Sequence, residues 1–256
     1  MEKLIIVKVG GAVLEDQSTL NDFLNQFAAI PYKKILVHGG GRAATKLSKQ
    51  LGIETKMVDG RRITDEETIK IVTMVYGGLI NKNTVAGLQA KGCNALGLTG
   101  VDMNLISAVK RPVAEIDYGL VGDVTRVNTF AFNLLLQADF VPVIAPITHD
   151  NKGQLFNTNA DTVASSIATS LTAIYDVSLV YCFEKAGVLS DPDNDESVIE
   201  ALNIELYQDY KKSGLIHSGM IPKLDNSFNA LEKGVREVLI TNAVTLNTGK
   251  GTHLSL

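Results

Sequence analysis

Two lysines lie in sequence settings that normally exclude an isolated positive charge. Lys8 lies inside the apolar run Leu4–Val9, and Gly10 and Gly11 follow that run directly. A buried ammonium without a partner is strongly disfavoured, so Lys8 either reaches solvent along its stem or meets an anion. Lys223 lies near a helix start, where the helix dipole disfavours a cation unless an anion is close. Because glycines let backbone N–H groups approach phosphate oxygens, this combination predicts a phosphate site.

A second glycine-rich turn follows the next predicted strand. Lys34–His38 leads into Gly39–Gly41 and then into a helix-forming stretch over 43–51. One glycine triplet is an ordinary tight turn, but two strand-to-helix turns of this kind favour a shared anion-binding edge. Neither turn matches the Rossmann or Walker pattern.

Two polar clusters could recognise a substrate. Arg61 and Arg62 precede a predicted helix, and an arginine fork suits bidentate capture of a carboxylate, although a solvated loop charge has the same sequence. Asn157, Asn159 and Asp161 gather at another helix start, where capping accounts for only one of them. The clusters therefore indicate substrate contacts beside the phosphate site.

Asp161 is the best candidate to organise the two lysines. If Lys8 and Lys223 converge on one phosphoryl group, their repulsion is about 4 kcal/mol at a separation of about 4 Å and an effective dielectric of about 20. An anionic substrate and a carboxylate between them would offset it. Phosphoryl transfer needs mostly positioning and charge stabilisation, so two lysines, glycine N–H groups and a magnesium-bound nucleotide suffice without a protein nucleophile.

The other reactive residue types predict no further chemistry. The four histidines show no metal-ligand spacing, so a protein-held metal is not expected. Cys93 and Cys182 lie far apart in apolar surroundings and are predicted to be buried free thiols.

The composition places these residues in a compact protein. The chain has 256 residues, 45% hydrophobic and 20% charged, with a net charge of −4. No apolar run approaches the roughly 18 residues of a membrane span, and the weakly acidic balance gives no general attraction to nucleic acid. The N-terminal run is interpreted as a first strand rather than a signal peptide, which predicts a cytoplasmic protein with small-molecule partners.

Short β-branched runs alternate with helical periods, the pattern of a mainly parallel sheet covered by helices on both faces. The predicted strands are Leu4–Val9, Lys34–His38, Phe140–Ile147, Ser178–Phe183 and Glu237–Ile240. One helix begins near Asn159–Asp161 and another follows Pro222. No linker separates independent domains, so two lobes would have to share one sheet.

A further helix follows Thr64–Glu67, which has the pattern of a capping box. Its predicted buried stripe is Ile69, Val72, Tyr76, Leu79 and Ile80. Arg111–Val127 lacks a helical period and predicts hairpin strands at a sheet edge, and the polar segment Ser190–Ser197 predicts a surface loop.

Together the motifs resemble the amino acid kinase family over nearly the whole chain. In order they are Lys8–Gly11, His38–Gly41, Gly60–Thr64, Asn157–Asp161, Gly219–Lys223 and Gly249–Thr252. The G-x-R-x-T and N-x-N-A-D elements are similar to its acylglutamate kinase branch. The resemblance implies a three-layer αβα sandwich whose two lobes share one sheet. Residues 1–172 would bind the acylglutamate and dimerise, and residues 173–256 would bind the nucleotide.

The resemblance also implies a reaction, in which the γ-phosphate of MgATP passes to the side-chain carboxylate of an N-acetyl- or N-succinyl-L-glutamate in arginine biosynthesis. Lys8 and Lys223 would stabilise the transferring phosphoryl group, and Asp161 would orient both lysines. Arg62 would hold the α-carboxylate of the substrate. The remaining implied contacts are Gly40, Gly41 and Asn157 for the substrate, and Gly10, Gly11, Glu184, Lys185, Gly187, Leu189, Gly219 and Met220 for the nucleotide.

The chain departs from the family pattern in Cys182–Leu189, where Glu184 stands in place of the usual Asp. Family members dimerise through the helix that starts here near Thr64, which offers a reason for Gly77 and Gly78 within it. Because the sequence starts at its first strand, without the N-terminal helical extension of the hexameric, arginine-inhibited branch, a homodimer that arginine does not inhibit through that device is expected.

Two alternative functions stay open. Another amino acid kinase, with a carbamate- or aminoadipate-type substrate, would share the glycine turns, but Arg62 and Asn157 weigh against it. A non-catalytic ligand-binding protein of the same fold would not need Lys8, Lys223 and Asp161 together. The sequence leaves both acetyl and succinyl open as the acyl group.

Overall fold

The computed structural model describes residues 1–58, 60–191, 193–216 and 220–256. Its centre is an eight-stranded sheet with the order β12-β14-β13-β11-β1-β2-β8-β5. Neighbouring strands pair in parallel, except that β13 and β14 are antiparallel. The strands are β1 Lys3–Val9, β2 Lys33–His38, β5 Ala95–Thr99, β8 Val141–Ala145, β11 Asp176–Phe183, β12 Ala201–Asn203, β13 Glu237–Asn242 and β14 Thr252–Ser255. Four of the five predicted strands are confirmed. The fifth, Phe140–Ile147, is divided at Pro146 into β8 and the first residue of β9, Ile147–His149, which belongs to another sheet.

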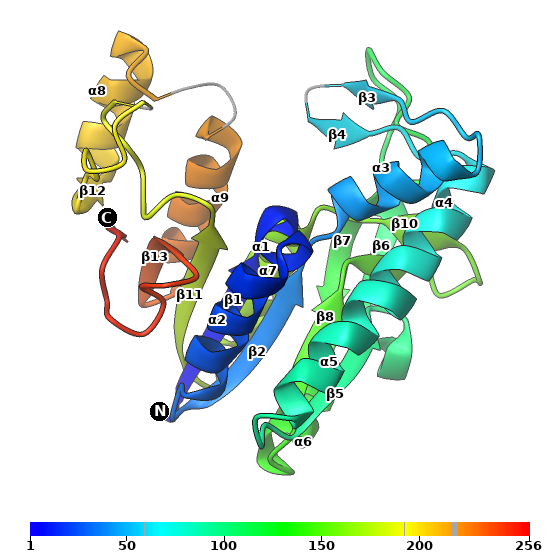
Figure 1. The fold of residues 1–256 in the computed structure, drawn as a ribbon, viewed down its shortest axis with the longest axis horizontal. Helices are drawn as coiled ribbons and strands as arrows, with labels where there is room; N and C mark the ends of the chain where they lie inside the picture. The colour runs from blue at the N-terminus through cyan, green and yellow to red at the C-terminus, as the bar shows by residue number, and fades with distance from the viewer. Residues whose placement is uncertain (59, 192, 217–219) are drawn as a thin grey trace.

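Helices cover both faces of this sheet, which confirms the three-layer arrangement (Figure 1). One layer contains α6 Thr129–Gln137, α7 Ala160–Leu171, α8 Ile204–Ser213 and α9 Ile221–Glu232. The opposite layer contains α1 Gly11–Glu15, α2 Gln17–Ala28 and α5 Asn81–Gln89. The sheet draws strands from both sides of residue 172, so it runs through both halves of the chain.

The alternation of side chains along β1 decides where Lys8 points. Leu4 and Ile6 belong to the core beneath α7, whereas Val7 and Val9 belong to the core beneath α1 and α2. Since successive strand residues face opposite sides, Lys8 lies on the α7 face. The strand therefore presents this lysine to the N-terminus of α7 at the carboxyl edge of the sheet.

A smaller sheet, in the order β10-β9-β6-β7, lies beside the main one. Its strands are β6 Ile106–Lys110, β7 Gly122–Val127, β9 Ile147–His149 and β10 Leu155–Asn157. The segment Arg111–Val127 was predicted to form both strands of a hairpin at a sheet edge. It contains one edge strand, β7, but the strand that pairs with β7 lies before this segment. That partner is β6, which ends before Pro112. Proline removes a ladder donor, and Gly119 has a φ of +71°, so the intervening segment forms turns.

The helix predicted after Thr64–Glu67 exists but differs in two respects. It runs through α4 Glu66–Val72 and a π-helix, η1 Thr73–Ile80, into α5. The cap is Asp65, whose carboxylate accepts from the Thr68 N–H at 2.8 Å, and not Thr64. Leu79 is 58% exposed and does not belong to the buried stripe. The wider winding of a π-helix, with i→i+5 bonds, turns this residue outward.

The other predicted helix starts are confirmed. Asn159 caps α7, and Pro222 lies in the first turn of α9. Helix α3, Gly41–Gln50, follows the second glycine turn, and β3 Met57–Val58 pairs with β4 Arg61–Arg62 in a short hairpin above it. The described residues of Ser190–Ser197 form a turn-rich segment, and Pro192 lies outside the description. None of the described helices has the length and apolarity needed to cross a membrane.

Candidate active site

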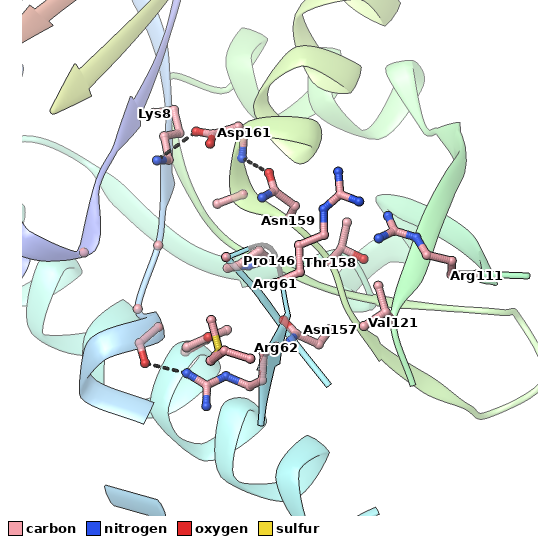
Figure 2. A pocket seen from close by; sticks show the side chains of 18 residues that line it. Lys8, Arg61, Arg62, Arg111, Val121, Pro146, Asn157, Thr158, Asn159 and Asp161 are labelled. Atoms are coloured by element: carbon pink, nitrogen blue, oxygen red, sulfur yellow. Dashed lines mark hydrogen bonds and ion pairs between the residues drawn. The ribbon is translucent and has the colours of Figure 1, made fainter. Parts of the chain in front are cut away.

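The carboxyl edge of the central sheet carries a pocket lined by residues between Lys8, at the end of β1, and Asp161, in the first turn of α7. The two glycine turns touch there, because a Cβ atom on Gly11 would lie 3.7 Å from the Gly40 nitrogen. Figure 2 shows Lys8, Arg62, Asn157 and Asp161 around this pocket. A second pocket shares Lys8 and Gly11 with the first and continues toward Lys223. The two glycine turns therefore lie side by side at one edge of the sheet, as expected, and anion binding there stays a prediction.

A buried ion pair lies at the centre of the site. The Lys8 ammonium is 2.8 Å from the Asp161 carboxylate, and the two side chains are only 8% and 12% exposed. Asn159 accepts from the backbone N–H groups of Asp161 and Thr162, at 2.8 and 3.0 Å, and so fixes the first turn of α7. The cap and the strand together hold the carboxylate against the lysine.

Lys223 approaches the same point from α9. Burial lowers the pKa of its ammonium below the usual lysine value; the negative charge of Asp161 opposes this shift and the positive charge of Lys8 adds to it. Asp161 forms its ion pair with Lys8 and interacts with Lys223 only through its charge. The Phe183 ring, at the end of β11, lies under both ammonium groups, 4.7 Å from that of Lys8 and 3.9 Å from that of Lys223.

Arg62 is buried in the wall of the first pocket. Its Nη2 donates to the Gly41 carbonyl at 2.7 Å and to the Thr45 hydroxyl at 2.8 Å, and its Nη1 donates to the Thr55 hydroxyl at 3.2 Å. A guanidinium has five N–H donors, so these three bonds to described residues leave at most two for a ligand. The arginine is thus fixed to the N-terminus of α3 before any carboxylate arrives.

Two further predicted substrate contacts lie in the same wall. Asn157 donates from its side-chain nitrogen to the Thr64 hydroxyl at 3.0 Å, which orients the amide. Gly40 lies directly beneath η1, where a Cβ atom would come within 2.6 Å of Tyr76 and of Ile80. This glycine is therefore required by the close approach of the turn to the π-helix.

The predicted nucleotide residues surround the second pocket and an adjoining apolar one. Glu184 forms an exposed ion pair with Arg42 at 3.1 Å, and Lys185 forms one with Asp195 at 2.5 Å. The adjoining pocket is lined by Lys185, Gly187, Val188, Leu189, Leu215, Ile216 and Met220. Gly187 also packs against Thr252, whose hydroxyl would lie 2.6 Å from an added Cβ atom. Gly219 lies outside the described residues.

The expectation that Gly10 donates its N–H to phosphate is wrong for this structure. That N–H donates to the Cys182 carbonyl at 3.0 Å, which joins the first glycine turn to β11. Gly11, in contrast, opens α1, where the first N–H groups have no intrahelical acceptor. Of the pair, Gly11 is therefore the better candidate to donate its N–H to a phosphate.

Sequence reasoning missed two aromatic residues of the site. Tyr76 lines the first pocket and approaches Arg62, whose charge lowers the phenol pKa against the larger raising effect of burial. Phe183 immediately precedes Glu184, the residue that replaces the usual Asp. It was predicted only as the end of a strand and given no role of its own. The stripe at Tyr76 was interpreted as core, and nothing in the spacing of either residue distinguishes a core aromatic from one at a site.

Two more arginines belong to the first pocket. Arg61 and Arg111 line it beside Arg62, and Arg111 is held by Asp123, with Nη2 at 2.6 Å from the carboxylate. No group of three His, Cys, Asp or Glu side chains able to hold a metal occurs among residues 1–58, 60–191, 193–216 and 220–256. The pocket is therefore strongly cationic and suits anionic ligands.

Comparison with known proteins gives consistent results. A model described as the amino acid kinase family matches residues 3–242. Acetylglutamate kinase of Bacteroides fragilis is 60% identical, covering 99% of this chain and 97% of that protein, and acetylglutamate kinase of Phocaeicola vulgatus is 59% identical, covering 98% of each. The crystal structure of smu.665 from Streptococcus mutans matches with a TM-score of 0.81 at 28% identity and covers 98% of each chain.

Proposed function

The chain belongs to the amino acid kinase family and, within it, to the acetylglutamate kinases, and on this premise we propose that it phosphorylates an N-acyl-L-glutamate with ATP. An oxygen of the substrate's side-chain carboxylate attacks the γ-phosphorus of ATP. The new O–P bond forms as the bond to the bridging oxygen of the β-phosphate breaks. The products are an acyl phosphate and ADP, and the acyl phosphate would serve arginine biosynthesis.

The observation that carries this proposal is the buried pair of Lys8 and Asp161 with Lys223 beside it. Two ammonium groups at one point stabilise the charge that spreads over the phosphoryl oxygens in the transition state. Asp161 holds Lys8 in place through their ion pair, and it carries out no chemistry itself. These three residues would be the catalytic group, and Mg²⁺ would arrive with the nucleotide, held mainly by its phosphates.

The acyl acceptor fits the first pocket. Arg62 retains N–H donors for the α-carboxylate, the Asn157 amide is held by Thr64, and the turn at Gly40–Gly41 contributes backbone groups. Arg61 and Arg111 add positive charge to the same wall. This arrangement favours a dicarboxylate acceptor over the small carbamate ion.

The nucleotide fits the second pocket and its apolar extension. Lys8 and Lys223 would meet the γ-phosphate, and Leu189 and Met220 would contact the base in the adjoining apolar pocket. We therefore assign acylglutamate binding and dimerisation to residues 1–172 and nucleotide binding to residues 173–256. Glu184 and Lys185 are exposed, so the nucleotide would meet them at the rim of the second pocket.

We further propose a homodimer formed through η1. Met74 and Leu79 on this helix are 54% and 58% exposed, and a side chain at Gly78 would meet no atom of its own chain within 4 Å. Exposed apolar side chains favour contact with another protein surface, and the lack of a side chain at Gly78 leaves room for a second helix to pack closely. Cys93 and Cys182 are both free and buried, as expected, which suits the reducing cytoplasm.

The test is ATP-dependent acyl-phosphate formation, trapped with hydroxylamine. Glutamate, N-acetyl-L-glutamate, N-succinyl-L-glutamate, N-acetyl-L-aminoadipate and carbamate are compared at equal concentrations. Hydroxamate from either acylated glutamate supports the proposal and identifies the acyl group.

The same panel, together with the reverse reaction of carbamoyl phosphate and ADP, separates the alternative functions. Product from the aminoadipate compound alone, or ATP formation from carbamoyl phosphate and ADP, would assign a different amino acid kinase. ATP binding without any product would favour a non-catalytic protein of this fold.

A further inference from the structure

The site contains an aromatic side chain that has no assigned role in the proposed phosphoryl transfer. Phe183 is the last residue of β11, and its ring lies 4.7 Å from the Lys8 ammonium and 3.9 Å from the Lys223 ammonium, each measured to the ring centroid. The ring also stacks in parallel with that of Tyr181, two residues earlier, at 6.0 Å and 2°. Phe183 thus contacts both lysines while its own orientation is fixed from the strand.

This placement solves an electrostatic problem. Lys8 and Lys223 repel each other and burial disfavours the charged form of Lys223, whereas the negative charges of Asp161 and Glu184 favour it. Asp161 forms its ion pair with Lys8, and Glu184 forms its ion pair with Arg42. The face of an aromatic ring attracts cations through its quadrupole, most strongly where water is excluded. Among the described residues Lys223 forms no ion pair, and the ring of Phe183 is a partner that its ammonium does contact.

A ring is also better suited to this position than a second carboxylate. A negative charge between the lysines and the nucleotide would repel the transferring phosphoryl group and compete with it for the ammonium groups. An aromatic face holds the cations without a net charge, so the positive potential at the pocket remains available to the phosphate.

We propose that Phe183 is a positioning residue that holds the Lys8 and Lys223 ammonium groups over its ring so that both meet the transferring phosphoryl group. This inference rests on the proposed kinase function. Phe183 makes no contact with the reacting atoms in this account and acts only through the two lysines. A purely structural role, in which the ring fills space beside Tyr181, is the alternative that the experiment must separate.

The experiment compares Phe183→Leu, which keeps apolar bulk and removes the ring, with Phe183→Tyr, which keeps the ring. We expect Phe183→Leu to lower kcat about tenfold with little change in either KM, because ordering of the cations matters most in the transition state. Its loss of activity at high pH should begin at lower pH, since the ring no longer favours charged lysine. Phe183→Tyr should retain both kcat and the pH profile.

Matched controls define the specificity of the effect. Tyr32→Leu removes an exposed ring from Lys3, 4.8 Å away at the opposite end of β1, and should change nothing. If Phe183→Leu fails to fold, Phe183→Met takes its place. Equal losses in Phe183→Leu and Phe183→Tyr, or a wild-type pH profile in Phe183→Leu, would show that the ring only fills space.

A second measurement is independent of turnover. In protein labelled with ¹³C-lysine, the Lys223 side chain is titrated by NMR in wild type and in Phe183→Leu. The proposal predicts a lower titration midpoint in the variant, and an unchanged midpoint overturns it. Absence of acyl phosphate from the wild-type protein would instead refute the proposed function and leave this titration to decide the ring's effect on Lys223.

Discussion

At the scale of single residues, the site depends on charges removed from water. Lys8 and Asp161 are buried and compensate each other, whereas Lys223 is half-buried, forms no ion pair with a described residue and lies against an aromatic ring. Breaking a buried pair by removing one partner is costly, because the other charge is left uncompensated. The same charges that make the site costly to fold make it attractive to phosphate.

His38 gives a pH-dependent prediction for stability. Its ring is fully buried, with Nδ1 2.9 Å from the Gly39 carbonyl and Nε2 3.2 Å from the Asn81 amide nitrogen. Burial lowers the His38 pKa from 6.5 to about 4, against a smaller raising effect of the Gly39 hydrogen bond. Between these values the unfolded chain binds a proton that the folded chain does not. Stability is therefore present above pH 6.5 and lost as the pH falls toward 4.

The expected loss between pH 7 and pH 5 is about 2 kcal/mol from His38 alone. It is measured by urea unfolding of wild type and of His38→Gln, which has no titrating group. The difference between the two pH profiles isolates the histidine from the carboxylates. Parallel profiles would show that His38 has an ordinary pKa.

The residue types and spacings predicted Lys8, Asp161, Arg62 and Asn157 because each carries a polar group in an otherwise apolar or capped setting. They did not predict Phe183 or Tyr76. An aromatic residue in a strand or an apolar stripe has the pattern of a core residue. Only the three-dimensional arrangement shows that the Phe183 ring lies against two lysines and that Tyr76 lines the first pocket.

At the scale of elements, the starts of strands and helices could be predicted from local sequence, whereas the π-helix η1 could not. Asn159 and Pro222 mark helix starts by their own chemistry, so α7 and α9 were predictable. The π-helix η1 was not, because i→i+5 winding has no propensity signature in the sequence. This is why Leu79 was wrongly assigned to the core.

The contact between η1 and Gly40 gives a prediction at this scale. Gly40→Ala places a Cβ atom 2.6 Å from Tyr76 and Ile80, so the turn must move away from η1. We expect KM for the acylglutamate to rise about tenfold or more, since small displacements of positioning groups are costly.

Gly41→Ala is the matched comparison, because its Cβ atom would lie 3.9 Å from the nearest atom. It should raise KM less. Steady-state kinetics of the two variants at saturating ATP decide the matter, and equal effects would mean that the close approach to η1 is unimportant for binding.

At the scale of the whole molecule, one sheet connects the two halves of the chain. β1 and β2 carry the first lysine and the glycine turns, and β11 pairs directly with β1 and ends at Phe183. The halves therefore meet at the carboxyl edge, where the sequence rule for open α/β sheets predicted the ligand. The chain before and after residue 172 contributes strands to the same sheet, and the functional division between these two parts is a proposal about which pocket each ligand occupies.

The proposed dimer is tested at this scale by light scattering after gel filtration. One chain weighs 27.5 kDa, and we expect a species of twice that mass. Leu79→Glu should give the single-chain mass, because it places a charge on the exposed apolar side of η1. Val113→Glu, at an exposed apolar position outside this helix, is the control and should remain dimeric. A wild-type protein of single-chain mass would exclude the dimer.

The most direct test of the central claim is the hydroxamate assay on Lys8→Ala, with ATP affinity measured in parallel by calorimetry. Lys3→Ala, which removes a lysine at the other end of β1, is the control. We expect kcat to fall about 100-fold or more in Lys8→Ala with ATP affinity changed only a few-fold, and no change in Lys3→Ala. Turnover that persists nearly unchanged in a folded Lys8→Ala protein would contradict a role for Lys8 in phosphoryl transfer.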